Sequence, residues 1–279
     1  MKKISRRSFL AASGLTIAAL ALTACGGSAS TASSAASSVA ASSEAASTSA
    51  AAAELTTVEA GKLTMATNAA FPPYEMTTDA GEFEGIDIDT AKAIAEKLGL
   101  ELQIDDMDFD AALLSVQQGK ADIVMAGVTV TDERKAVMDF SDSYATGIQS
   151  IIVPEGSDIT SPDDLAGKKI GTQRGTTGYI YCSDDFGDDA VVAYDDGLTA
   201  VQALNNGQVD AVVIDNAPAK EFVAANPGLV ILDTSYAEED YAIGLAKGSA
   251  LEDAVNAALE ELKADGTLQS IVDKYITAE

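Results

Sequence analysis

Short apolar runs alternate with amphipathic stretches along the chain from Lys62 onward. KLTMAT, LELQI and DIVMAG have the length and composition of buried strands, whereas DTAKAIAEKLG and FDAALLSVQQG repeat apolar residues at helical spacing. Strands that alternate with helices in this order are typical of parallel βαβ units. This part of the chain is therefore predicted to form an α/β layer.

A second series of the same kind follows the strand predicted at YATGIQSIIVP, residues 144–154. It contains the strand candidates KKIGT, AVVAY, DAVVID and LVILD and the helix candidates LTAVQALNNG and PAKEFVAAN. EDYAIGLAKG predicts one more strand, and two helices are predicted at 251–264 and 268–275. The fold class indicated by the whole pattern is α/β.

Two such series, connected by two crossings of the chain, are most simply assembled as two lobes. Each lobe is predicted to be a mainly parallel sheet flanked by helices, and a two-strand hinge joins the lobes. We place lobe one at 61–146 and 240–279 and lobe two at 147–239. Strand ends of both lobes then face one cleft, and domain interfaces often hold small-molecule sites.

The chain contains two copies of one helix-turn-strand unit. LLSVQQGKADIVMAG at 113–127 and VQALNNGQVDAVVID at 201–215 align without a gap. In this alignment Gly127 and Asp215 occupy equivalent positions, each at the carboxyl end of a strand. Ligands of doubly wound α/β sheets bind at this end, so both positions are candidates for a binding site.

The N-terminal stretch is predicted to direct export. Residues 1–24 have the layout of a signal peptide, and SRRSFL leaves Sec and Tat export both open. LTACGG resembles a lipobox, in which Cys25 would carry a lipid anchor at the outer face of the cytoplasmic membrane; a soluble secreted protein is the alternative. Residues 25–60 are rich in Ser and Ala and are predicted to be a flexible tether.

The composition excludes several classes of function. A formal net charge of −27 argues against nucleic acid and anionic lipid as partners. The absence of histidine removes Ser-His-Asp and Cys-His catalysis and the commonest zinc ligand. With Cys25 lipidated, Cys182 has no partner for an intramolecular disulfide. The acidic cluster DDMDFD lacks the glycine and final glutamate of an EF-hand loop, so neither a metal nor a cofactor is predicted.

Polar groups at the predicted strand ends are complementary to a free amino acid. AGVTVTDER supplies the carbonyl of Gly127, the hydroxyl of Thr129 and the guanidinium of Arg134, whose planar fork matches a carboxylate. An arginine after a strand is more often a surface ion pair, so this motif alone leaves both interpretations open.

The turn QRGTTG lies between a predicted strand and a predicted helix, so the backbone N–H groups at Thr176 and Thr177 would form an anion site. The same turn could be a plain helix cap. An α-carboxylate held by Arg134 and this turn, with an α-ammonium held by Asp215 and the strand-end groups of lobe one, describes an amino acid.

Two aromatic residues stand next to these motifs. Phe71 follows the first strand and Phe109 precedes a helix, and the two could sandwich an aliphatic side chain or belong to the core. The sequence leaves the ligand side chain open, because the residues that could contact it include acidic, neutral and basic groups: Asn68, Glu75, Asp87, Gln173 and Arg174.

Several segments resemble the family 3 extracellular solute-binding proteins, which are polar amino acid receptors of ABC importers. The similar segments are ATNAAFPPYE, GIDIDTAKAIAEKLG, MDFDAALLSVQQGKADIVMAGVTVTDERK, DFSDSY and DAVVIDNAPA, and the resemblance covers about 62–275. It implies a two-lobed periplasmic-binding-protein-like fold, a monomer, an amino acid ligand, a membrane permease as partner, and neither cofactor nor catalytic residue.

The resemblance also assigns roles to single residues. It implies aromatic stacking on the ligand by Phe71 and Phe109, and capture of the ligand backbone by the strand-end motifs. Asn68, Gln173 and Ile214 stand where the glutamine-binding member has aspartate, lysine and histidine. The ligand-binding residues expected on this basis are Asn68, Phe71, Phe109, Gly127, Thr129, Arg134, Gln173, Thr176, Thr177 and Asp215.

Two other functions use the same scaffold. One is an amino acid sensing module that reports to a partner without transport. The other is an enzyme similar to cyclohexadienyl dehydratases, which use an acid in the cleft. Because the chain has no histidine to act as a base near neutral pH, the binding function is favoured over the enzymatic one.

Overall fold

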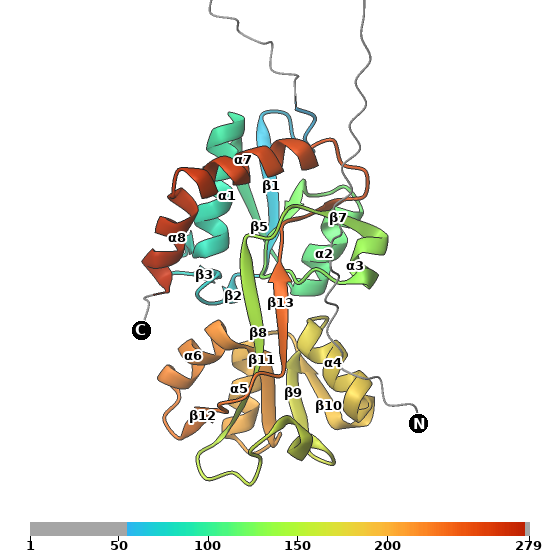
Figure 1. The fold of residues 1–279 in the computed structure, drawn as a ribbon, viewed down its shortest axis with the longest axis vertical. Helices are drawn as coiled ribbons and strands as arrows, with labels where there is room; N and C mark the ends of the chain where they lie inside the picture. Colours follow the sequence, from blue (N-terminus) through green and yellow to red (C-terminus); the bar gives the residue numbers. More distant parts are fainter. Residues whose placement is uncertain (1–54, 277–279) are drawn as a thin grey trace, which may run out of the picture. The chain divides into compact units, whose positions relative to one another are not determined.

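The computed structural model describes residues 55–276, so the predicted signal peptide, Cys25 and most of the predicted tether lie outside the described residues. Lobe one contains a five-stranded sheet (Figure 1). In the order of the sheet, its strands are β5 (Glu101–Asp106), β1 (Lys62–Thr67), β6 (Ile123–Val124), β14 (Gly244–Ala246) and β7 (Met138–Phe140).

Helices cover both faces of this sheet. α1 packs against α7 and α8 on one face, and α2 contacts β1, β6 and β14 on the other (Figure 1). The helices are α1 (Ile86–Leu98), α2 (Phe109–Gln117), α3 (Asp132–Val137), α7 (Glu252–Ala264) and α8 (Thr267–Tyr275). A small antiparallel sheet of β2 (Ala70–Phe71), β3 (Glu75–Thr77) and β4 (Phe83–Glu84) follows β1.

Lobe two contains the second large sheet. Its strands are β10 (Val191–Tyr194), β9 (Ile170–Gln173), β11 (Ala211–Asp215), β8 (Ala145–Pro154) and β12 (Leu229–Ile231), with β13 (Ala237–Tyr241) also paired to β8. The helices are α4 (Thr177–Phe186), α5 (Gly197–Asn205) and α6 (Asn216–Ala225), with short 3-10 turns η1 (Pro162–Leu165) and η2 (Asp188–Ala190). The chain passes between the lobes along β8 and β13 (Figure 1).

Alternate residues of the central strands enter different parts of the core. In β11, Ala211 and Val213 pack in a cluster with Cys182 of α4, while Val212 and Ile214 pack with α5 and α6. Side chains of a strand point alternately to opposite faces, so a strand covered on both faces is apolar throughout. This explains why the sequence shows continuous apolar runs instead of alternation.

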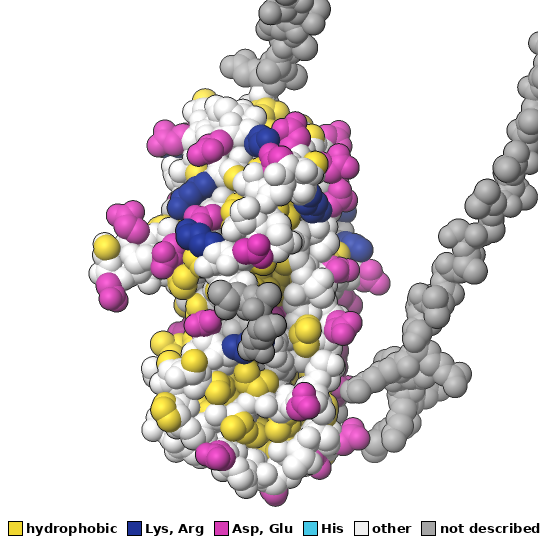
Figure 2. All heavy atoms as spheres, turned by 60° about the vertical axis from the view of Figure 1, so that its left-hand side comes forward, with side chains coloured by type: hydrophobic (Ala, Val, Ile, Leu, Met, Phe, Trp, Pro, Cys, Tyr) yellow, Lys and Arg dark blue, Asp and Glu magenta, His cyan; other side chains and the backbone are white. Residues whose placement is uncertain are grey.

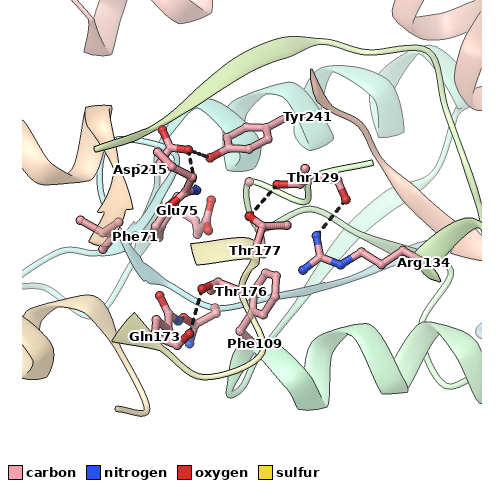
Figure 3. Close-up of a pocket in the computed structure, with 15 residues that line it drawn as sticks. Phe71, Glu75, Phe109, Thr129, Arg134, Gln173, Thr176, Thr177, Asp215 and Tyr241 are labelled. Carbon is pink, nitrogen blue, oxygen red and sulfur yellow. Dashed lines mark hydrogen bonds between the residues drawn. The ribbon is translucent and has the colours of Figure 1, made fainter. Parts of the chain in front are cut away.

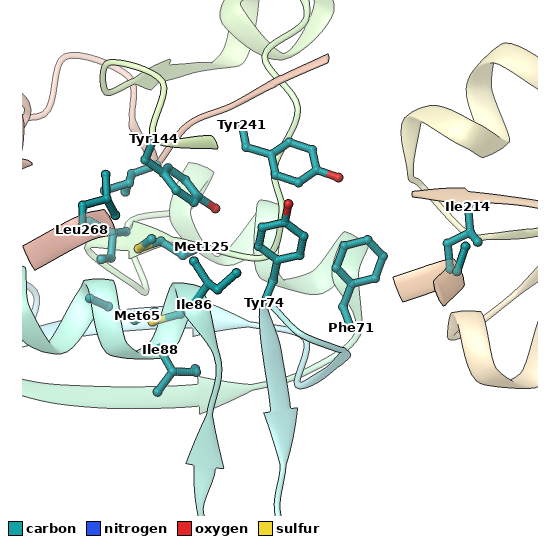
Figure 4. Packing of buried hydrophobic residues seen from close by; sticks show 14 of the residues in the cluster. Met65, Phe71, Tyr74, Ile86, Ile88, Met125, Tyr144, Ile214, Tyr241 and Leu268 are labelled. Carbon is teal, nitrogen blue, oxygen red and sulfur yellow. The ribbon is translucent and has the colours of Figure 1, made fainter. Parts of the chain in front are cut away.

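The core of lobe one reaches the boundary between the lobes. Tyr74 and Tyr241 meet edge to face there, with ring centroids 5.3 Å apart. Figure 4 shows both rings between the core of lobe one and Ile214 of lobe two. The aromatic pair therefore lies where the two lobes contact each other.

The two copies of the repeated unit have the same local structure. Asp122 accepts a hydrogen bond from the backbone N–H of Thr64 at 2.7 Å, and Asp210 accepts one from the backbone N–H of Lys169 at 2.8 Å. In each lobe the acid after the helix-strand turn therefore accepts a hydrogen bond from the backbone near the beginning of the neighbouring parallel strand. The repeat seen in the sequence is a repeat of contacts as well.

The two-lobed α/β fold is confirmed, and three details differ from the sequence-based predictions. The sheets are mixed, because β14 and β7 in lobe one and β8, β12 and β13 in lobe two are antiparallel to their neighbours. EDYAIGLAKG forms β13 and β14, one in each sheet, instead of one strand. The sequence analysis also did not anticipate α3, β7 or the small sheet. We retain the boundaries after 146 and after 239 as a proposal.

Acidic side chains outnumber basic ones on the face of the molecule in Figure 2. This distribution agrees with the formal net charge of −27. A surface of this sign repels phosphate backbones.

Candidate functional site

One cavity is bounded by residues of both lobes (Figure 3). About 390 Å³ of space free of protein atoms lies within its bounds, part of it open to solvent. The ten residues predicted to bind a ligand all line it, together with five others. The lining residues are Asn68, Phe71, Glu75, Phe109, Ala126, Gly127, Thr129, Arg134, Gln149, Gln173, Thr176, Thr177, Ile214, Asp215 and Tyr241.

Arg134 is the cationic residue of the cavity. It lies in α3, whose N-cap Thr131 accepts a hydrogen bond from the Arg134 backbone N–H. Its guanidinium donates to the carbonyl of Thr129 in lobe one at 2.8 Å and to that of Gly175 in lobe two at 3.2 Å. The guanidinium carbon also lies 5.4 Å from the ring centroid of Phe109, which is within the range of a cation–π contact.

The charge of Arg134 is buried without a paired acid. The side chain is 8% exposed, and it forms no ion pair with any acidic residue among 55–276. Burial lowers the pKa of Arg134 from its ordinary value, and the negative charge of Glu239 partly offsets this effect. A buried cation of this kind favours an anionic group as its neighbour.

The start of α4 borders the same part of the cavity. Thr176 is its N-cap, and the Thr176 hydroxyl accepts from the backbone N–H of Tyr179 at 3.4 Å and donates to the carbonyl of Gln173 at 2.8 Å. The hydroxyl of Thr177 lies 3.4 Å from that of Thr129 in lobe one. The first N–H groups of a helix have no partner within the helix, so this end is suited to an anion.

Asp215 is the buried acid at the end of β11, with 2% exposure. It accepts a short hydrogen bond from the Tyr241 hydroxyl and longer ones, both 3.4 Å, from the backbone N–H of Ile148 and the amide of Gln149. Burial raises the pKa of Asp215 to about 7, against the opposing effect of the Tyr241 hydroxyl. The carboxylate is therefore poorly neutralised within the protein.

Two glycines make room for these groups. A Cβ on Gly147 would lie 2.6 Å from Asp215 Oδ2 and from the ring of Tyr241. Gly127 has φ +55, and a Cβ there would lie 3.0 Å from the ring of Phe71. The backbone conformation of Gly127 favours glycine, and a Cβ there would also crowd the aromatic ring beside it.

Asn68 and Gln173 join the lobes by a direct hydrogen bond. The amide of Gln173 in lobe two donates to Asn68 Oδ1 in lobe one at 2.8 Å. The amide nitrogen of Asn68 in turn donates to the carbonyl of Met107 at 2.9 Å. Asn68 and Gln173, whose residue types differ from those of the glutamine-binding member, are therefore hydrogen-bonded to each other.

Sequence reasoning missed the polar residues contributed by the strands that cross between the lobes. Glu239 of β13 accepts from the Thr129 hydroxyl at 3.1 Å and from the amide of Gln149 at 2.9 Å. Gln149 lines the cavity itself, as does Tyr241. One signal was available: Gln149 is a polar residue inside the apolar stretch GIQSIIV, where only a satisfied or functional polar group is expected.

Two of the residues considered as contacts of the ligand side chain do not line the cavity. Arg174 is an exposed residue whose guanidinium lies 3.5 Å from a carboxylate oxygen of Asp195. Asp87 is completely buried behind the cavity, where it contacts Gly127. Cys182 also lies elsewhere, in the core beside α4, and burial raises the pKa of its thiol to about 12.

The described residues 55–276 contain no helix long and apolar enough to span a membrane. Within the same residues no group of three His, Cys, Asp or Glu side chains is arranged to hold a metal ion. The cavity lining includes hydrogen-bond donors, carboxylates and aromatic rings. Such a set can bind a small polar molecule that carries charges of both signs.

Comparison with known proteins agrees with this geometry. A probable histidine-binding protein of Neisseria gonorrhoeae is 32% identical over 276 residues, covering 96% of this chain and 95% of its own. The arginine-, lysine-, histidine-binding protein ArtJ of Geobacillus stearothermophilus has a similar structure, with TM-score 0.75, 34% identity, and coverage of 78% of this chain and 96% of its own.

An ancestral arginine-binding protein is also similar in two structures. The structure with bound glutamine has TM-score 0.75 and 43% identity and covers 78% of this chain and 99% of its own. The structure with bound arginine has TM-score 0.74 and 43% identity and covers 77% and 98%. Residues 63–278 match the model of the bacterial extracellular solute-binding proteins, family 3. On this match, and on a cavity built from the strand ends of two lobes, the chain belongs to that family.

Proposed function

We propose that this chain is the extracytoplasmic substrate-binding component of an ABC importer, and that it captures a polar amino acid between its lobes for delivery to a membrane permease. One observation carries the proposal. Among residues 55–276, one cavity holds a buried guanidinium without an acidic partner, Arg134, and a buried carboxylate without a cationic partner, Asp215. A zwitterion would supply both missing charges.

The proposed roles follow from the hydrogen-bonding capacity of each group. Arg134 and the Thr176/Thr177 turn at the start of α4 hold the α-carboxylate. Asp215 and the oxygens of Gly127 and Thr129 hold the α-ammonium, which has three donors and no acceptor. The remaining predicted lining residues surround the ligand side chain: Phe71 and Phe109 stack on it, and Asn68 and Gln173 lie beside it.

Similar proteins support a polar amino acid as the ligand class. Their names and structures refer to histidine, arginine and glutamine. They are binding proteins, and we propose that this chain likewise performs no catalysis and acts as a monomer. No specific feature of residues 55–276 favours the sensing module or the dehydratase-like enzyme over transport.

Binding of the twenty amino acids, followed by thermal shift and then calorimetry, tests the function. A ligand at 100 times its Kd should add about 2.7 kcal/mol to the free energy of unfolding. Arg134→Gln should weaken binding at least about a hundredfold, because it removes one partner of a buried charge pair. Arg174→Gln is the matched control, since Arg174 is exposed and does not line the cavity, and should bind normally. Equal affinities of the two variants would reject the proposed carboxylate site.

We also propose that Cys25 carries a lipid anchor. This residue lies outside the described part of the chain, so the support comes from LTACGG and the Ser- and Ala-rich stretch behind it. Cys25→Ala should release the protein from membranes and leave ligand affinity unchanged. Cys182→Ser is the control and should stay membrane-bound. Retention of the Cys25 variant after a salt wash would show that attachment has another cause.

A further inference from the structure

Glu75 is an acid of the cavity that the recognition of the ligand backbone does not use. It begins β3, its side chain is 0% exposed, and it lines the cavity. Figure 3 shows it among the side chains directed into this space. Neither of its carboxylate oxygens accepts a hydrogen bond from a donor of residues 55–276. A carboxylate in this position costs free energy unless it is protonated or meets a cation.

A second buried acid, Asp87, is the group whose charge acts most strongly on Glu75. Asp87, in the first turn of α1, accepts from the backbone N–H of Gly127 at 3.0 Å and from the Tyr144 hydroxyl at 2.8 Å through one oxygen. Its other oxygen has no donor among the described residues. The backbone N–H of Asp87 donates to the carbonyl of Tyr74, the residue before Glu75, at 2.8 Å, and burial and then the charge of Asp87 raise the pKa of Glu75. Two neighbouring buried carboxyl groups without donors are costly to ionise together, so one proton is expected to stay on the pair.

The other groups around the pair supply no positive charge. Asp106 of β5 adds a negative charge, and the hydroxyls of Tyr74 and Tyr144 are neutral because burial raises the pKa of both. On β4, Glu84 is partly exposed and pairs with Met76 instead of Glu75.

Across the cavity the remaining charged groups are Asp215 and Arg134. Burial, followed by the charge of Asp87, raises the pKa of Glu75 well above its usual range, and burial raises the pKa of Asp87 to about 6. The position of the pair therefore favours retention of a proton near neutral pH.

We propose that Glu75 and Asp87 share one proton, and that a cationic ligand side chain takes its place while an uncharged amide side chain leaves it bound. This inference rests on the proposed function, because it concerns the side-chain end of the same amino acid site. On binding a guanidinium or ammonium group, the O–H bond of the pair breaks and the proton passes to solvent. The carboxylate left behind pairs with the cation. With an amide ligand, the retained O–H can donate to the amide carbonyl.

The proposal makes the ligand preference depend on pH. Because the binding of a cation releases a proton, its affinity should rise by up to about tenfold per pH unit in the range where the pair titrates. The affinity for an uncharged amide should lack this contribution. Raising the pH therefore favours L-arginine over L-glutamine, and lowering it brings the two closer together.

Calorimetry on the unmodified protein tests this directly. L-arginine and L-glutamine are titrated near neutral pH in phosphate and in Tris, whose ionisation enthalpies differ, and the proton release is obtained from the difference. Asp215 can lose a proton to solvent when either ligand binds, because both ligands carry the α-ammonium that Asp215 is proposed to hold. The informative quantity is therefore the difference between the ligands, and arginine should release about one proton more than glutamine.

Glu75→Gln should remove this extra proton and weaken arginine binding at least about tenfold, while glutamine binding changes little. Glu84→Gln, on the neighbouring strand β4, is the matched control and should behave as the unmodified protein. Equal proton release for both ligands in the unmodified protein would overturn the inference and leave the proposed function intact. Binding of uncharged amino acids alone would likewise overturn the inference and leave the proposed function intact. Failure of all twenty amino acids to bind would overturn the proposed function itself.

Discussion

Asp215 and Asp122 are buried acids with different hydrogen-bond environments. Asp122 accepts from the backbone N–H groups of Val58 and Thr64, both at 2.7 Å, and so satisfies two fixed donors. Two of the hydrogen bonds that Asp215 accepts are 3.4 Å long, and burial raises its pKa to about 7. Asp122 is therefore a structural acid, while Asp215 keeps capacity for a cation.

This difference predicts opposite effects of the same substitution. Asp215→Asn should lower ligand affinity at least about a hundredfold, because an α-ammonium would be buried without its counter-charge. Asp122→Asn should leave affinity unchanged and lower the free energy of unfolding by about 1–3 kcal/mol, because a buried N–H loses its acceptor. Calorimetry and urea unfolding of both variants provide the comparison. Normal binding by Asp215→Asn, combined with a large loss of stability, would make Asp215 a structural acid too.

Asp215 should also make stability depend on pH. The pKa of this group is 3.8 when unperturbed and about 7 in the folded chain, so between these values the folded chain holds a proton that the unfolded chain has lost. Its contribution to stability is complete below pH 3.8 and is lost as the pH rises toward 7. In urea unfolding without added ligand, Asp215→Asn should therefore gain stability relative to the unmodified protein across this window. A constant difference between the two proteins would contradict the raised pKa.

At the scale of elements, each copy of the repeated unit has an equivalent glycine in the turn between its helix and its strand. Gly119 and Gly207 both have φ +66, and a Cβ on either would meet no atom within 4 Å. Alanine at either position should cost about 1–2 kcal/mol from the left-handed backbone alone. Neither glycine lines the cavity, so ligand affinity should be retained. Urea unfolding of Gly119→Ala and Gly207→Ala tests the equivalence, and a loss in one lobe without the other would refute it.

The elements that the sequence predicts well are those with local causes. Continuous apolar runs such as the one in β11 reflect burial on both faces, and the helices between them carry their own periodicity. The division of 239–248 into β13 and β14 has no such cause. Its residues from Tyr241 to Leu245 are buried throughout, and the break arises because β13 pairs with β8 while β14 pairs with β6 and β7. Only non-local pairing distinguishes one strand from two.

The cavity follows the same principle. The ten predicted residues carry recognisable side-chain chemistry at strand ends, and all of them line the cavity. Glu75 was considered only as one of several readers of the ligand side chain. Its distinctive property is that it is buried near Asp87 without a hydrogen-bond donor among the described residues, and this depends on how β3 packs against α1. No property of the sequence near either acid specifies that contact.

At the scale of the whole described unit, contacts between the lobes converge on the cavity. Arg134 of lobe one donates to the Gly175 carbonyl of lobe two, and Gln173 of lobe two donates to Asn68 of lobe one. A ligand that touches both lobes should therefore favour the arrangement in which they meet. We expect the radius of gyration in solution to decrease when ligand is added.

Gly175 provides a way to prevent this closure. It has φ +73, and a Cβ there would overlap the Asp110 carboxylate of lobe one. Gly175→Ala should weaken binding and reduce the change in small-angle scattering, and removing the obstructing carboxylate with Asp110→Ala should restore both. Gly187→Ala is the control, because Gly187 has φ +86 at the other end of α4 and an open surrounding. Unaltered closure of Gly175→Ala would show that the two lobes do not meet at this point.

The order of the strands in lobe one has a consequence for synthesis. β14 lies between β6 and β7, although more than half of the described chain separates it from the start of β1. Leu251, Val255 and Leu259 of the last segment complete the same core as Leu63 and Ile94. As the chain emerges with its N-terminus first, at the ribosome or during export, the sheet of lobe two is complete at β13, whereas lobe one still lacks an inner strand and two helices. The lobe that begins first is therefore the last to become whole, and its unpaired strand edges depend on the final residues for protection from aggregation.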